Sequence, residues 1–211
     1  MTGSALDEAG IALVRLAAAI AAGDPHLIGA AVVGVMAAGV PPRAVDELVL
    51  QSVLTVGWPR ALVAAGTWRS VIGAPADAGD DLDYANHREW TRRGEATCRI
   101  IYGDHYEKLR GNVRALHPAL ERWMVTEGYG RTLARPGLAL ALRELCTVAQ
   151  TAVLRTPRQL HSHLLGALRS GASVDEVDAT LRIVQPLLPE SDWQDAATLW
   201  QRVRDAAGTQ Q

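Results

Sequence analysis

The sequence contains no phenylalanine, and aromatic residues make up only 5% of its 211 positions. Charge is balanced as well as sparse, with 21 basic against 23 acidic side chains and a net charge of −2. Such a balance gives no bulk attraction to nucleic acid or to an acidic membrane surface, so we expect neither as a partner. The sequence also lacks a glycine-rich phosphate loop and a low-complexity segment. A small molecule is therefore the expected partner.

Cysteine is nearly absent too. The only two residues, Cys98 and Cys146, lie far apart in the sequence. Without a signal-like N-terminal segment, we expect a cytoplasmic protein in which both thiols are reduced, buried and small apolar side chains. The apolar stretch 11–22 is interrupted by Arg15 and is too short to span a bilayer. We therefore expect no membrane association.

Hydrophobic residues reach 48%, mostly as Ala, Leu and Val, and no segment shows the period-two alternation of a strand. Apolar side chains instead recur at three- and four-residue steps, which predicts an all-α protein. Glycine and proline mark helix boundaries. We expect breaks between helices at 23–25, 57–59, 155–157 and 186–189.

The pattern of breaks occurs twice. A shift of 132 residues superposes Pro25 on Pro157, Gly39 on Gly171 and Trp68 on Trp200, with no gap over about sixty positions. Such a register predicts an internal duplication. We expect a first, degenerate helical repeat at 1–72, a linker at 73–83, and a domain at 84–211 that carries the second repeat at 140–204.

The second repeat contains a helical hairpin from about 143 to 171 that brings a carboxylate and an imidazole into an apolar setting. Glu144 lies on its first helix and His163 on its second, whereas the first repeat has Ala12 and Ala31 at these positions. Thr156 is expected to cap the second helix. Because a purely structural pair would be expected in both copies, the asymmetry favours a catalytic pair. A buried structural bridge is the alternative.

Four segments resemble the carboxymuconolactone decarboxylase family, which includes the alkylhydroperoxidase D-like proteins. They are RGEATCRIIYGDHY near 93–106, WMVTEGYGRTLARPGL at 123–138, RELCTVA at 143–149 and QLHSHLLGALRSGASVDEV at 159–177. The resemblance implies an all-α alkylhydroperoxidase D-like fold. It also implies a homo-oligomer, either a trimer or a hexamer.

The redox branch of that family carries a Glu, a Cys-x-x-Cys motif and a His. Glu144 and His163 keep the spacing of that branch, 19 residues, but Thr156 and Gln159 stand at the two cysteine positions. Without a thiol pair there is no disulfide cycle. The decarboxylase branch, which also lacks the cysteines, is the closer match and implies a cofactor-free carboxy-lyase. A peroxiredoxin-like antioxidant activity using Cys146 and a non-catalytic ligand-binding relative are the alternatives.

In the decarboxylase branch the substrate is a carboxylated unsaturated lactone, whose reaction needs a proton donor and a cation for the carboxylate. The resemblance implies His163 as the acid and Glu144 as the residue that orients it. Arginines are suited to bind carboxylates in a bidentate way, so Arg131 also qualifies. We expect no metal, although the His-x-His pattern leaves it as a minor alternative. The predicted substrate-binding residues are Arg143, His161, Glu127, Tyr129 and Arg135.

Overall fold

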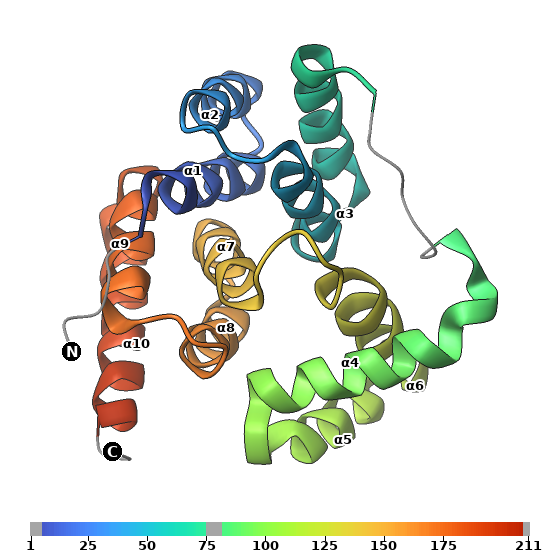
Figure 1. Ribbon diagram of the computed structural model, residues 1–211. Coiled ribbons are helices and arrows are strands. Elements are labelled where there is room, and N and C mark those ends of the chain that lie inside the picture. Colours follow the sequence, from blue (N-terminus) through green and yellow to red (C-terminus); the bar gives the residue numbers. More distant parts are fainter. Residues whose placement is uncertain (1–5, 75–81, 209–211) are drawn as a thin grey trace.

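The structure is a computed structural model that describes residues 6–74 and 82–208 (Figure 1). Over these ranges the chain is helical and contains no strand, which confirms the predicted all-α class. The elements in chain order are α1 (Glu8–Ala22), α2 (Pro25–Ala37), α3 (Pro42–Ile72), η2 (Tyr84–Asn86), α4 (His87–Tyr102), η3 (Gly103–His105), α5 (Tyr106–Leu116), α6 (Pro118–Trp123), η4 (Met124–Leu133), α7 (Leu140–Val153), α8 (Pro157–Arg169), α9 (Val174–Val184), η5 (Gln185–Leu187) and α10 (Glu190–Gly208).

The predicted duplication is present in the backbone. Helices α1 and α2 have the same order and register as α7 and α8, and each second helix ends at a glycine with positive φ, +65° at Gly39 and +104° at Gly171. The amide of Val40 donates to the carbonyl of Val35 at 3.0 Å, and the equivalent bond of the second copy measures 2.9 Å. Only glycine adopts such a conformation without strain, so both copies need it at this position.

The two repeats share one apolar core. Helix α1 packs against α7, and Figure 1 shows α7 near the middle of the molecule, between the first repeat and the remaining helices. Leu13 and Leu145, which are equivalent in the two copies, are both buried in this core. Burial of this kind is the main source of stability in a helical protein. The apolar core shared by the two repeats therefore determines the positions of α7 and α8.

Helix α3 is interrupted at Gly57, whose φ of +70° and ψ of 175° are not helical. The break falls within the predicted 57–59. Among the described helices, α3 alone is long and apolar enough to cross a membrane by length and composition, a test that core helices of soluble proteins also pass. Because of the kink at Gly57, α3 consists of two shorter helices, as the sequence predicted.

The helices between the repeats approach each other closely. A Cβ atom on Gly94 of α4 would lie 1.9 Å from the carbonyl oxygen of Val125, and one on Gly130 would lie 1.8 Å from that of Trp90. Element η4, Met124–Leu133, is a π-helix. A π-helix is rare and is often found at functional sites. It carries Glu127 and Tyr129, two of the predicted site residues.

The predicted linker at 73–83 lies mostly outside the described residues, which omit 75–81. Helix α4 follows this region and packs against both η4 and α8. The division of the chain at 72 and 84 remains a prediction.

Candidate functional site

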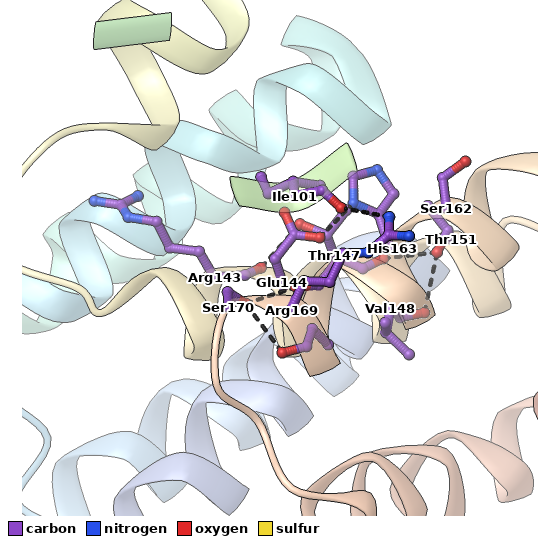
Figure 2. A network of polar contacts seen from close by, with 12 residues as sticks. Ile101, Arg143, Glu144, Thr147, Val148, Thr151, Ser162, His163, Arg169 and Ser170 are labelled. Carbon is purple, nitrogen blue, oxygen red and sulfur yellow. Dashed lines mark hydrogen bonds and ion pairs between the residues drawn. The ribbon is translucent and has the colours of Figure 1, made fainter. Parts of the chain in front are cut away.

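Glu144 of α7 and His163 of α8 are in direct contact. The Nδ1 atom of His163 lies 2.8 Å from Oε2 of Glu144, and Figure 2 shows the ring and the carboxylate facing each other between the two helices. The Glu144 side chain is 0% exposed and that of His163 13%. An ionised carboxylate can only accept, so Nδ1 carries the proton and donates it. The other ring nitrogen, Nε2, is then left without a partner among the described residues.

A glycine on α8 makes room for the carboxylate. A Cβ atom on Gly166 would lie 2.4 Å from Oε2 of Glu144 and 2.8 Å from the Ile101 side chain of α4. Its equivalent in the first repeat, Gly34, has nothing within 4 Å. The carboxylate is therefore enclosed between α7, α8 and α4. Its second oxygen, Oε1, is buried without a hydrogen-bond partner in the described chain, an arrangement that costs stability and that functional sites often retain.

His163 lies on the wall of a pocket of about 570 Å³. The pocket is formed by α3, α6, η4, α7 and α8, and it is mostly apolar with a few polar groups, as is usual for a small-molecule site. Its lining comprises Gln51, Leu54, Thr55, Leu120, Trp123, Met124, Glu127, Gly128, Tyr129, Leu133, Thr147, Thr151, Leu154, Thr156, Gln159 and His163.

Tyr129 is a further polar residue of the pocket lining. It lines the pocket from η4, and its hydroxyl is hydrogen-bonded to that of Tyr102 on α4. Burial raises the pKa of Tyr129 well above 10, and the neighbouring Tyr102 and Glu144 add to the effect. The phenol therefore stays protonated at neutral pH and can donate a hydrogen bond. Tyr102 in turn reaches a second, smaller pocket on the other side of α4 and α8.

The two positions at which the redox branch carries thiols both face the pocket, as Thr156 and Gln159. The Thr156 hydroxyl does not cap α8 as predicted. It donates to the carbonyl of Thr151 at 3.2 Å, because the hairpin turn folds it back toward α7. Cys98 and Cys146 are both buried and free, as expected. Burial raises the pKa of the Cys146 thiol to about 12, so neither its position nor its acidity suits a redox thiol.

Arg143 does not reach the pocket. Its guanidinium is 0% exposed and lies 2.9 Å from Glu47 on α3, and in Figure 2 it extends away from His163. It also donates to the Gln51 side chain and to the carbonyls of Leu138 and Arg135, so every donor nitrogen is bound. Glu47 accepts from Arg135 as well, at 3.1 Å. These contacts place both arginines in an ion cluster between the repeats, outside the lining of the pocket, and their substrate role remains a prediction.

The remaining predicted residues divide between two surfaces. Glu127 and Tyr129 line the pocket, with Glu127 held by Arg131 at 3.0 Å. Arg131 itself stacks on Tyr84 and Trp90 outside the pocket. His161 is exposed and lies in the smaller pocket with Tyr102, on a different face of α8 from His163. Of the predicted substrate-binding residues, the structure thus brings Glu127 and Tyr129 to His163.

Two polar residues of the wall, Gln51 and Thr55 of α3, were not predicted. Thr55 donates to Gln150 at 2.7 Å, which fixes its hydroxyl at the pocket. Both could have been found in the sequence by comparing the two repeats. Their equivalents in the second copy are Ile183 and Leu187, so polar side chains replace apolar ones at these positions in one copy only.

Among the described residues that line the pocket, Glu127 is the acidic one and His163 the basic one, and Glu144 lies behind His163. None of the described residues that line it is an arginine or a lysine. Over the described ranges, no group of three His, Cys, Asp or Glu side chains is placed to hold a metal ion. The site therefore offers an imidazole, a phenol, hydroxyls and amides to a ligand.

Comparison with known families agrees with this geometry. The sequence profile of the carboxymuconolactone decarboxylase family matches residues 1–69 and 118–206. The chain belongs to the carboxymuconolactone decarboxylase family. No curated protein matches it. The matched regions include both repeats and the pocket walls, and they leave out 70–117. Membership places the protein among decarboxylase-like and alkylhydroperoxidase-like proteins. It does not identify the specific activity, which has to be inferred from the site.

Proposed function

We propose that this protein is a cofactor-free acid–base enzyme that decarboxylates or isomerises a small unsaturated lactone or carboxylate. The contact between His163 Nδ1 and Glu144 Oε2, 2.8 Å long, carries the proposal. It fixes the imidazole at the pocket wall with one nitrogen bound to a buried carboxylate, while no described residue is bound to the other. General acids and bases are commonly histidines oriented in this way.

In the decarboxylation, the bond between the ring carbon and the carboxylate breaks and carbon dioxide leaves. The electron pair passes into the conjugated lactone and gives an enolate. Protonated His163 then gives its Nε2 proton to carbon, and solvent returns a proton to the ring. Isomerisation uses the same groups, with His163 first removing a proton and then returning it at another carbon. Glu144 stabilises the imidazolium that either sequence requires.

The lack of an arginine or lysine among the described lining residues restricts the substrate. With no arginine or lysine at the wall, an anionic group must be held by the imidazolium, the Tyr129 hydroxyl and neighbouring amides. Hydrogen bonds to a developing enolate strengthen in such an apolar site, because the local dielectric is low. The pocket thus suits a compact lactone with at most one carboxylate.

A thiol-dependent peroxidase activity has less support. Cys146 is buried within α7, and its raised pKa keeps it as an unreactive thiol at neutral pH. Thr156 and Gln159 cannot form a disulfide. The pocket lining instead contains His163, a side chain suited to proton transfer.

The test is a screen of small unsaturated lactones, each with and without a carboxylate, followed by NMR in D2O. Carbon dioxide release or deuterium uptake at carbon identifies a substrate. Replacing His163 with Gln should reduce turnover by roughly 10²–10⁴, the usual loss of a general acid, while melting temperature and oligomeric state stay the same. The matched control is His161→Gln, two residues away on the other face of α8, which should retain turnover.

Two outcomes contradict the proposal. If the His163→Gln protein melts much earlier but its folded fraction turns over normally, the pair is a structural bridge. If the lactones bind at His163 without any turnover or exchange, the protein is a ligand-binding relative of the family.

We also propose that the protein is a homo-oligomer, a trimer or a hexamer. Exposed apolar side chains on α3, among them Leu54, Trp58 and Leu62, support self-association. Sedimentation that gives a monomer at micromolar concentration would refute this.

A further inference from the structure

The first repeat contains a second pocket, of about 670 Å³, whose lining comes from α1, α2 and the region at the end of α9. Its walls are built mainly from alanine, glycine and aliphatic side chains. Figure 1 shows α1 and α2 on the opposite side of α7 from α4 and α5. This pocket shares no lining residue with the one at His163, so the two are separate.

The walls of the two pockets are related by the duplication. On α1 and α2, four lining residues lie 132 positions before four lining residues of the His163 pocket. Arg15, Ala19, Leu27 and Ala31 correspond to Thr147, Thr151, Gln159 and His163.

The opposite walls of the two pockets show the same offset of 132 positions, but here the residues of the second pocket come later in the sequence. Ile183, Pro186 and Leu187 of the second pocket lie 132 positions after Gln51, Leu54 and Thr55 of the first. Seven residues on two separate walls thus share one register. The second pocket is therefore the counterpart of the candidate active site, and not an accidental gap between helices.

The chemistry of this counterpart differs. Ala12 and Ala31 replace the Glu144–His163 pair, and Ile183 and Leu187 replace Gln51 and Thr55. These exchanges remove acid–base chemistry and make the pocket more apolar. One cation is gained, because Arg15 stands where the active pocket has Thr147. Arg15 makes no hydrogen bond or ion pair with any described residue, and it is exposed.

The charges fix the orientation of a ligand. Glu8 is the other charged residue of the lining, and it lies seven residues from Arg15 on α1, about 10.5 Å along the helix axis. An anionic group is attracted to the Arg15 end and repelled from the Glu8 end. The apolar floor between them, with Ala12, Ala31 and Ile183, suits a hydrocarbon or aryl body.

We propose that this pocket is a non-catalytic binding site for an apolar monocarboxylate, with the carboxylate on Arg15 and the apolar body on α2 and the end of α9. The α6 and η4 wall that closes the active pocket has no counterpart here, so a ligand enters directly from solvent. The site works independently of the proposed enzyme reaction.

The probe is 4-phenylbutyrate, and its neutral analogue 4-phenylbutanamide is the control. Calorimetry of the full chain should show binding of the acid and at least tenfold weaker binding of the amide. Amide shifts in NMR should map the acid to α1, α2 and α9. Arg15→Gln should weaken binding of the acid at least tenfold and leave the amide unaffected, whereas Arg15→Lys should retain most of the affinity.

A second variant tests the cavity without touching charge. Gly34 lies on the pocket wall, is exposed and has nothing within 4 Å, so Gly34→Leu has space to fill the pocket while favouring the helix. It should abolish binding with no loss of melting temperature, and His163→Gln should bind as the wild type does. Equal binding of acid and amide, shifts at the His163 pocket, or no binding by the wild type would overturn the proposal. So would a change of oligomeric state in Gly34→Leu, which would make this face an interface between copies.

Discussion

The indole N–H of Trp200 donates a hydrogen bond of 2.6 Å to the carboxylate of Asp178, and Trp68 donates one of the same length to Asp46. The two pairs lie 132 residues apart, and both indoles are buried. A buried indole N–H needs an acceptor, so the carboxylate fixes how the last helix of each repeat packs. The duplication therefore preserves a specific polar contact as well as an apolar pattern.

Because the two pairs are equivalent, removing the carboxylate should lower the free energy of unfolding by a similar amount in each copy. Replacing Asp178 with Ala leaves a buried N–H without an acceptor and should lower the free energy of unfolding by about 1–3 kcal/mol. Asp46→Ala should cost at least as much, because Asp46 also forms an ion pair with Arg69, whereas Arg204 lies 3.8 Å from Asp178. Urea titration of both variants measures the change. A loss below about 0.5 kcal/mol in either would show that water satisfies the indole.

A larger loss of stability is predicted for the ion cluster between the repeats. Glu47 accepts from both Arg143 and Arg135, and the Arg143 side chain is fully buried. Burial lowers the pKa of Arg143, and Glu47 opposes that effect. Glu47→Gln leaves a buried guanidinium without its counter-ion and should cost about 3–5 kcal/mol.

The matched control replaces both charges at once. An Arg143→Met, Glu47→Leu double variant should be closer to the wild type than Glu47→Gln, because a buried ion pair is often replaceable by apolar side chains. If the double variant is the less stable of the two, the hydrogen bonds of Arg143 to the carbonyls of Leu138 and Arg135 dominate instead.

The sequence predicted those features that depend on local pattern. Glu144 and His163 were placed together because helical periodicity and a short turn put both on facing sides of a hairpin. The burial of Arg143 against Glu47 was not foreseen, because the two residues lie 96 positions apart and periodicity on one helix cannot reveal which distant helix covers it.

The π-helix at η4 could not be predicted for a related reason. Its wider turn accompanies the close backbone approach at Gly94 and Gly130, which is a property of two helices and not of one sequence segment. The contact of Tyr129 with Tyr102 follows from this packing. Gln51 and Thr55 could have been found by comparing the two repeats, because each is polar where its counterpart is apolar.

Burial of the thiols predicts a loss of stability at alkaline pH. The pKa of Cys146 is raised to about 12, and that of Cys98 is raised further, both by burial. A thiol in the unfolded chain titrates near about 8.5, so above that pH the unfolded state has fewer bound protons than the folded state. Each thiol should then lower the free energy of unfolding by up to about 1.4 kcal/mol per pH unit, with stability fully retained below about pH 8.

Urea midpoints between pH 7 and 10.5 measure this slope, and a Cys98→Ala, Cys146→Ala double variant should have a shallower one. Iodoacetamide at pH 8 should label neither thiol in the folded protein and both in urea. Rapid labelling of Cys146 without urea would show that the thiol is accessible and would reopen the redox alternative.

The last prediction concerns the glycine beneath the acid–base pair. Gly166→Ala would place a Cβ atom 2.4 Å from Oε2 of Glu144, so the carboxylate has to shift away from His163. Gly34→Ala is the matched control, because Gly34 has the same place in the first repeat and nothing lies within 4 Å of it. The control should gain up to about 1 kcal/mol from replacing a helical glycine. The site variant should lose that gain and reduce turnover, because the displaced carboxylate no longer orients the imidazole of His163.

The comparison separates a positioning role from a packing role. If Gly166 only provides space, Gly166→Ala should lower the melting temperature relative to Gly34→Ala while the folded enzyme keeps its turnover. If it positions Glu144, turnover of the folded Gly166→Ala enzyme should fall toward that of Glu144→Gln, the variant that removes the charge. Wild-type turnover in folded Gly166→Ala would mean that the carboxylate remains in contact with His163 despite the added methyl group, and would remove the positioning role.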